Sequence, residues 1–124
     1  MVRGVILTHG TLGRELMASV QNVLGPQTDV DVLSNEGMSL EQITQTAQAT
    51  LSGTSLIFFV DFCGGSPYVA CKTLQQLHPE CAVISGVNMP MLFSFFTKRE
   101  QLGFQQLVET VESDGHRGIQ RISS

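Results

Sequence analysis

One five-residue segment limits the fold of this chain more than any other feature. Residues 56–60 read Leu-Ile-Phe-Phe-Val with no polar side chain, and Asp61 follows them directly. A strand with one exposed face alternates apolar and polar residues, whereas a strand covered on both faces reads as a continuous apolar run. The segment therefore predicts a buried strand in a parallel sheet that has helices on both faces.

Strand-like and helix-like segments alternate along the rest of the chain. We expect further strands at three short apolar segments, residues 2–7, 30–33 and 82–87. Apolar residues recur at helical spacing between these strands and again over residues 91–111. Because strands alternate with helices, the pattern predicts βαβ units and one α/β domain that covers residues 1–124.

Several local signals mark where these elements begin and end. Gly25-Pro26 is typical of a helix stop, and Ser39-Leu40-Glu41-Gln42 has the form of a capping box that opens the next helix. Near the end of the chain, Gly115 and Gly118 are expected to bracket a break. A last short strand is then predicted at residues 119–122.

Composition excludes several classes of protein. The 11 acidic residues outnumber the 7 basic ones, for a net charge of −4, so the chain lacks the basic surface of a nucleic-acid-binding protein. No run reaches the roughly 18 apolar residues of a membrane span, and the first apolar run is too short for a signal peptide. Three cysteines form no C-x-x-C pair, so reduced thiols and a cytoplasmic location are expected.

Polar residues stand where the predicted strands end. His9 follows the first strand, Asp61 ends the third, and Asn88 follows the fourth. In a parallel sheet these ends share one edge, where ligands bind at the point at which the winding reverses. If the first strand lies beside the third, Asp61 can accept the N–H of one imidazole nitrogen of His9 and leave the other as a nucleophile.

The turn that follows Asp61 adds a second functional signal. Ser66-Pro67 suits the start of any helix, but Gly64 and Gly65 before it let the backbone come close to a ligand. Free N–H groups at a helix N-terminus favour an anion, and a phosphoryl group on His9 would fit there. The neighbours of these residues are predicted to line the site, namely Thr8, Gly10, Asn88 and Met89.

The remaining histidines and cysteines do not suggest a metal site, because they are scattered along the chain. No G-x-x-x-x-G-K-[ST] phosphate loop is present either. We interpret His78 as a helix-end residue and His116 as a solvated turn residue. Cys71 and Cys81 are predicted to lie in the core, whereas Cys63, in the suspected site loop, is either redox-active or incidental.

Three segments, read in order, carry a resemblance to a known family. They are Val5–Gly10, Val60–Tyr68 and Gly86–Leu92, and the similarity continues to residues 115–118. Together they resemble the signature segments of the mannose-family EIIA domain of the bacterial phosphoenolpyruvate-dependent sugar phosphotransferase system (PTS). Three ordered motifs across nearly the whole chain are much more specific than any one of them.

The resemblance implies that the chain is a phosphocarrier. His9 would take a phosphoryl group from the phosphohistidine of the protein HPr and pass it to an EIIB component, expected to be a separate chain. The membrane permease would be reached only indirectly. Asp61 would orient the imidazole and stabilise its charge, while Ser66 and the amides near Gly64 and Gly65 would contact the phosphate. No cofactor is expected.

The fold expected from these observations is a three-layer α/β/α domain with a doubly wound, mostly parallel sheet. Its strand order is predicted to be 2-1-3-4, numbered along the chain. The resemblance also implies a homodimer in which residues 119–122 cross to the partner's sheet as a short antiparallel strand. Two positions depart from the family's pattern: Phe62-Cys63 replace threonine or leucine followed by an aromatic residue, and Val69 replaces asparagine.

Other functions stay open at this point. A similar domain occurs in the phosphoryl-donor subunit of the phosphoenolpyruvate-dependent dihydroxyacetone kinase. A regulatory module, whose phosphorylation state is itself the output, is a third possibility. A hydrolytic triad of His9, Asp61 and Ser66 is disfavoured, because no G-x-S-x-G elbow surrounds Ser66 and Pro67 follows it.

Overall fold

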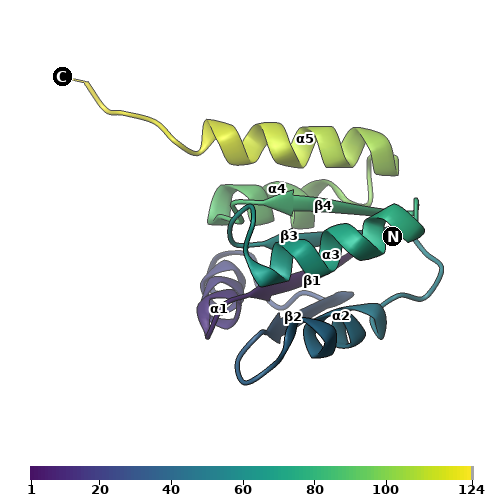
Figure 1. Cartoon of the computed structure of the whole chain (residues 1–124). Helices are drawn as coiled ribbons and strands as arrows, with labels where there is room; N and C mark the ends of the chain where they lie inside the picture. The colour runs from purple at the N-terminus through teal and green to yellow at the C-terminus, as the bar shows by residue number, and fades with distance from the viewer. Residues whose placement is uncertain (124) are drawn as a thin grey trace.

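The computed structural model describes residues 1–123, in which strands and helices alternate as the sequence predicts (Figure 1). The elements, in chain order, are β1 (Arg3–Thr8), α1 (Leu12–Leu24), β2 (Val30–Ser34), α2 (Leu40–Gln48), β3 (Leu56–Val60), α3 (Ser66–Leu77), β4 (Cys81–Ser85), α4 (Met89–Lys98) and α5 (Phe104–Arg117). The predicted capping box is present at α2, where Ser39 and Gln42 bond each other's backbone N–H groups.

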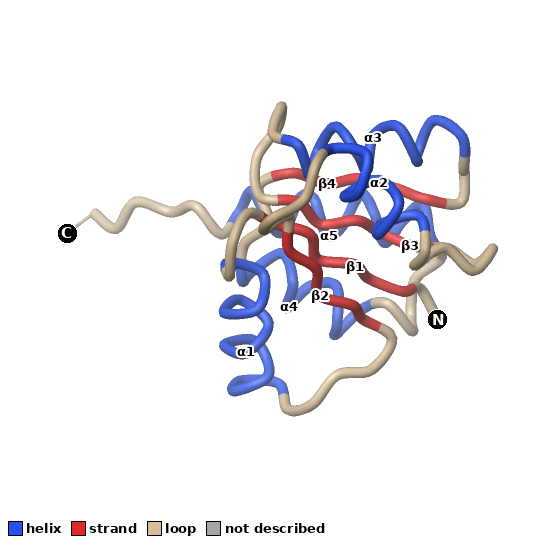
Figure 2. The backbone as a smooth tube through the Cα atoms, turned by 60° about the horizontal axis from the view of Figure 1, so that its bottom comes forward, coloured by secondary structure: helices blue, strands red, loops and turns tan. Residues whose placement is uncertain are grey.

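The strands form one parallel sheet in the order β2-β1-β3-β4 (Figure 2). The predicted fold class and strand order are thus confirmed. The winding reverses between β1 and β3, and Leu7 lies opposite Val60 in their register. His9 and Asp61 therefore leave neighbouring strands at nearly the same level, at the place where such sheets bind ligands.

The two faces of β3 explain its apolar sequence. Ile57 and Phe59 belong to the core layer beneath α1, α4 and α5, whereas Phe58 and Val60 belong to the layer beneath α2 and α3. All four side chains are completely buried. A polar residue at any of these positions would lose its hydration on one face or the other, which is why the run has no alternation.

The C-terminal part of the chain differs from the prediction. Helix α5 continues through Gly115 without a break and ends at Arg117, with Gly118 as its C-cap, so His116 lies in its last turn and not in a loop. Gly115 packs closely on α4, because a Cβ there would lie 2.7 Å from the Cε atom of Met91 and 3.2 Å from its Cβ atom. A glycine inside a helix ends it only when the backbone leaves the helical region, and here it does not.

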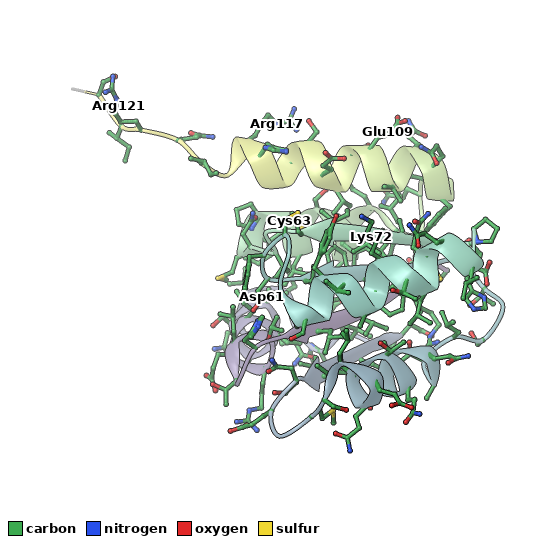
Figure 3. The ribbon with its side chains drawn as sticks, in the orientation of Figure 1. Asp61, Cys63, Lys72, Glu109, Arg117 and Arg121 are labelled. Atoms are coloured by element: carbon green, nitrogen blue, oxygen red, sulfur yellow. The ribbon has the colours of Figure 1, made fainter. Side chains whose placement is uncertain are left out.

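The predicted last strand is absent from this single chain. Residues 119–123 extend away from α5, past Arg117 toward Arg121, and form no strand (Figures 1 and 3). Ile119 is 84% exposed and Ile122 is 95% exposed. A strand requires a neighbouring strand for its backbone hydrogen bonds, and this segment has none within residues 1–123. The exchanged strand and the homodimer remain predictions.

One buried arginine ties α4 to the opposite end of the sheet. Arg99 is 5% exposed, and its guanidinium donates hydrogen bonds to the carbonyl oxygens of Thr28 at 2.7 Å and Asp29 at 3.3 Å. The same group lies 5.3 Å from the ring centre of Phe95 and 5.1 Å from that of Phe96. These contacts hold the turn that leads into β2.

We expect Arg99→Met to lower the free energy of unfolding by about 1–3 kcal/mol, because the carbonyl oxygens of Thr28 and Asp29 lose their charged hydrogen-bond donors. Arg99→Lys should lower the free energy of unfolding by roughly half as much, since lysine keeps the charge but lacks the forked donor geometry. Urea denaturation followed by circular dichroism measures both effects. The matched control is Arg14→Met on an exposed position of α1, and an equal change in both methionine variants would contradict the assignment.

Candidate active site

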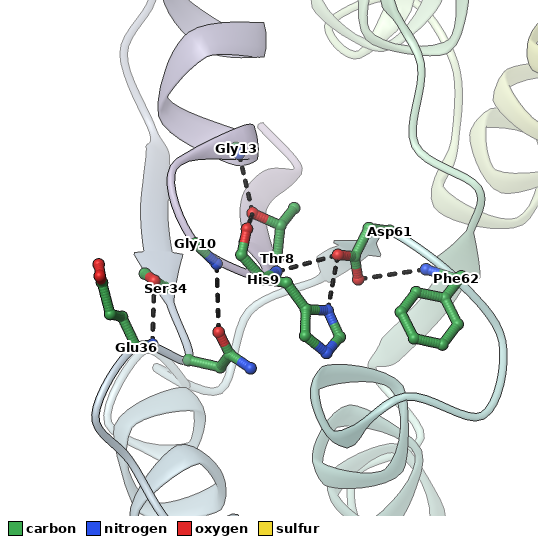
Figure 4. A network of polar contacts seen from close by, with 9 residues as sticks. Thr8, His9, Gly10, Gly13, Ser34, Glu36, Asp61 and Phe62 are labelled. Carbon is green, nitrogen blue, oxygen red and sulfur yellow. Dashed lines mark hydrogen bonds and ion pairs between the residues drawn. The ribbon is translucent and has the colours of Figure 1, made fainter.

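His9 and Asp61 form the centre of a polar network at the carboxyl edge of the sheet (Figure 4). The His9 Nδ1 atom lies 2.8 Å from Asp61 Oδ2, and the backbone N–H of His9 donates to the same oxygen at 2.9 Å. The second carboxylate oxygen, Oδ1, accepts the backbone N–H of Phe62 at 3.2 Å. The structure thus brings together the two residues that the predicted strand ends placed at one edge.

The charge on Asp61 determines the state of the imidazole. Burial by itself would raise the pKa of Asp61, but the hydrogen bonds from the backbone N–H and ring of His9 outweigh it and hold the pKa below its usual value. An ionised carboxylate can only accept hydrogen bonds, so we assign the ring proton to Nδ1. Nε2, on the far side of the ring, then carries a lone pair, and the side chain is 40% exposed.

Thr8 and Gly10 shape the loop that carries His9. The hydroxyl oxygen of buried Thr8 accepts the backbone N–H of Gly13 at 2.8 Å, which fixes the start of α1. Gly10 has a φ of +55°, a conformation that favours glycine, and its N–H donates to Asn35 Oδ1 at 3.2 Å. Sequence reasoning missed Asn35, although it follows β2 at the same edge of the sheet and the strand-end argument could have found it.

The glycine turn approaches the His9 ring closely. Gly64 has a φ of +96°, and a Cβ on Gly65 would lie 2.9 Å from the Cε1 atom of His9. Gly65, and not Ser66, is the N-cap of α3, with no side-chain cap hydrogen bond. In this geometry the N–H groups of Gly65, Ser66 and Tyr68 have no acceptor within the helix. The positive end of α3 therefore lies beside the imidazole and favours an anion there.

The hydrolytic triad that the sequence disfavours is not formed. Among residues 1–123, no hydrogen bond joins Ser66 to His9, although a serine nucleophile needs such a bond to its base. Asn88 and Met89, which were also predicted to line the site, stand at the start of α4. Asn88 caps α4 by accepting the N–H of Met91 at 2.9 Å, and in the described part of the chain neither residue forms a hydrogen bond with His9 or Asp61.

Comparison with known proteins decides the family. Residues 4–112 match the family model EIIA-man, described as the PTS system fructose IIA component. The chain belongs to the EIIA-man family. Members of this family are phosphotransferase components of the mannose, fructose and sorbose type, so the resemblance seen in the sequence is confirmed.

Two relatives show how far the similarity extends. The EIIA-man chain is 29% identical over 126 residues to the PTS system mannose-specific EIIAB component of Escherichia coli K12. This match covers 97% of the chain but 39% of the relative. The chain therefore spans about two fifths of the length of that relative. It is also 24% identical to the fructose-specific EIIA component of Bacillus subtilis 168, covering 97% of the chain and 86% of the relative.

Solved structures share the same fold. The EIIA component from Streptococcus agalactiae superimposes with a TM-score of 0.92 at 24% identity and covers 98% of this chain and 97% of its own. The mannose/sorbose-specific IIA subunit from Enterococcus faecalis gives a TM-score of 0.84 at 18% identity, and the match covers 98% of this chain and 95% of that subunit. These similarities show the EIIA-man fold in this chain.

Phe62 is a residue of this EIIA-man site to which the sequence alone gave no role. The ring of Phe62 stacks on the ring of His9, with centroids 5.0 Å apart and planes 21° from parallel. In the sequence, Phe62 was identified only as a position that departs from the family's pattern. Its position directly after Asp61 was the signal that it lies near the imidazole, but stacking depends on loop geometry that no periodicity reveals.

The other histidines and cysteines of the EIIA-man domain differ in burial and position. Cys71 and Cys81 are buried, as predicted, and burial raises the pKa of their thiols to about 12 and about 11. Cys63 is exposed, and His78 caps the C-terminal end of α3. Within residues 1–123 no group of three or more His, Cys, Asp or Glu side chains is placed to hold a metal ion. No helix of these residues has the length and apolar character to cross a membrane.

Proposed function

We propose that this EIIA-man domain carries a phosphoryl group on His9, accepting it from phospho-HPr and passing it to an EIIB component. The observation that carries the proposal is the 2.8 Å contact between His9 Nδ1 and Asp61 Oδ2. It leaves the lone pair of Nε2 available at a partly exposed ring, beside the N-terminus of α3. Catalysis by positioning and charge stabilisation is what phosphoryl transfer requires of a protein.

The transfer step balances without any other reactant. The Nε2 lone pair of His9 attacks the phosphorus atom of the donor's phosphohistidine, and a new N–P bond forms as the donor's N–P bond breaks. The donor imidazole leaves with the electron pair of that bond. The His9 ring keeps its proton on Nδ1 and so becomes positively charged, which the ionised Asp61 stabilises. Transfer to EIIB is the same step with His9 as the leaving group.

The glycine turn supplies the phosphate site in this scheme. Backbone N–H groups of Gly65 and Ser66 would contact the phosphoryl oxygens, and Gly64 permits the turn that aims them. Their partial positive charges, with the dipole of α3, favour the negative charge that is shared in the transition state. Thr8 and Gly10 hold the His9 loop in place and would not contact the phosphate themselves.

The proposal also assigns partners and a location. HPr and EIIB are the protein partners, a membrane permease is served only through EIIB, and the sugar does not touch this domain. The three cysteines are free thiols, which suits the reducing cytoplasm. Residues 119–123, exposed and without a strand partner in the single chain, would pair with a second copy in a homodimer.

Incubation with phosphoenolpyruvate, enzyme I and HPr tests the proposal. We expect one phosphoryl group per chain, labile in acid and stable in alkali, as a phosphorus–nitrogen bond requires. The control omits HPr and should leave the chain unlabelled. Failure to incorporate phosphate from a pool of phospho-HPr that labels a known EIIA domain would contradict the proposed function.

The fate of the phosphorylated chain separates the proposed carrier from its alternatives. Rapid loss of label to a mannose-family EIIB supports the carrier function. Transfer to the dihydroxyacetone kinase subunits, but not to EIIB, would assign the chain to that pathway. Stable label with neither acceptor would indicate a regulatory EIIA domain.

A further inference from the structure

Phe62 is a large aromatic side chain that the fold leaves at the surface of the site. Its residue is 53% exposed, and it belongs to neither core layer. Exposed aromatic rings lose the stabilisation that burial would give them. The ring of Phe62 stacks on the imidazole of His9, at 5.0 Å between centroids and 21° between planes.

The carboxylate of Asp61 binds both residues. Asp61 Oδ2 binds the backbone and Nδ1 of His9, while Oδ1 accepts the backbone N–H of Phe62. Gly65 closes the arrangement, because a Cβ there would lie 2.8 Å from Phe62 Cζ and 2.9 Å from His9 Cε1. The imidazole is therefore restrained at one edge by Asp61, on one face by Phe62 and at its rim by the main chain of Gly65.

We propose that Phe62 is a positioning residue for phosphoryl transfer, holding the plane of the His9 ring so that Nε2 meets the donor phosphorus in line. The inference rests on the proposed function. One hydrogen bond at Nδ1 fixes a point on the imidazole but permits rotation about it. A ring stacked on the face removes that freedom, and small errors of orientation slow group transfer strongly.

Phosphorylation strengthens the role of this stack. With a proton on Nδ1 and phosphorus on Nε2, the imidazole is positively charged and its face lies against the electron-rich face of Phe62. Such a cation–π contact is favourable, and more so than the contact of two neutral rings. Phe62 therefore stabilises the phosphorylated product as well as the geometry that leads to it, and it covers one side of the ring from water.

The test compares Phe62→Leu with Phe62→Tyr, which keeps the aromatic face, and with Leu77→Ala, an exposed apolar residue at the far end of α3 that is 70% exposed. At saturating phospho-HPr, Phe62→Leu should transfer about tenfold more slowly than wild type. Its half-saturating concentration of phospho-HPr should stay within about twofold. Phe62→Tyr should restore the rate to within about twofold, and Leu77→Ala should match wild type.

A small-molecule phosphoryl donor separates an effect of Phe62 on ring positioning from an effect on the docking of HPr. Phosphoramidate phosphorylates histidine without a docking surface, and the same tenfold loss is expected for Phe62→Leu with it. Equal phosphoramidate rates in wild type and Phe62→Leu, or a change confined to the half-saturating phospho-HPr concentration, would overturn the proposal. Labelling of wild type by phosphoramidate but not by phospho-HPr would overturn the proposed function instead, while the Phe62 comparison still decides the present inference.

Discussion

His9→Gln is expected to abolish phosphoryl acceptance, lowering incorporation from phospho-HPr by at least about 1,000-fold. Glutamine can still hydrogen-bond to Asp61 through its amide, but it has no nucleophilic nitrogen to take the place of Nε2. Because His9 is partly exposed and lies outside the core layers, the variant should fold with nearly unchanged stability. Radiolabelled phosphoenolpyruvate, with enzyme I and HPr, measures the stoichiometry directly.

His116→Gln is the matched control for this variant. His116 lies in the last turn of α5 with its side chain 77% exposed, and its nearest charged partner is Glu112 at 4.0 Å. This control should accept a full phosphoryl group per chain. A result in which His9→Gln keeps the label and His116→Gln loses it would move the phosphorylation site to α5 and remove the basis of the mechanism.

Asp61→Asn should slow phosphoryl transfer by about 100- to 10,000-fold while leaving the fold intact. An asparagine amide can donate to Nδ1, so the imidazole would place its proton on Nε2 and the nucleophilic lone pair would be lost. The neutral side chain would also fail to stabilise the positive ring of the phosphorylated form. Because the pKa of Asp61 lies below its usual value, wild type has the ionised carboxylate throughout the neutral range.

Single-turnover transfer from phospho-HPr at neutral pH measures the effect of Asp61→Asn. The matched control is Asp31→Asn, an equal change at a surface carboxylate that pairs with Arg3 on neighbouring strands. It should transfer at the wild-type rate. Wild-type transfer by Asp61→Asn would mean that the carboxylate neither selects the tautomer nor stabilises the charged ring.

Much of the site could be predicted from local sequence patterns. His9 and Asp61 were predicted to share one edge of the sheet, because each directly follows an apolar strand and parallel strands end at one edge. They were expected to meet if the first strand lay beside the third. Gly64 and Gly65 were recognisable because glycines before a helix permit a close backbone approach. These signals are local: they depend on the residues beside each position and on the period of the apolar pattern.

The incorrect and missed assignments all depend on contacts between distant segments. Gly115 was read as a break because glycine weakens a helix, but its place against Met91 depends on how α4 and α5 pack. Asn35 binds the Gly10 amide across two strands, and Phe62 reaches His9 across a loop. The exchanged strand at residues 119–122 stays a prediction, because it would need a second chain, and in the described single chain its backbone groups find no strand partner.

The sequence by itself determined the class of fold and the chemical groups at one edge of the sheet. Apolar runs and helical periodicity are properties of neighbouring residues, and hydrophobic burial turns them into strands and helices wherever they occur. Tertiary structure decided which strand ends became neighbours, through the order β2-β1-β3-β4. It also decided that Asp61 would accept the hydrogen bond of Nδ1–H and that Phe62 would stack on the ring. Distances and orientations between separate segments exist only once the layers have packed.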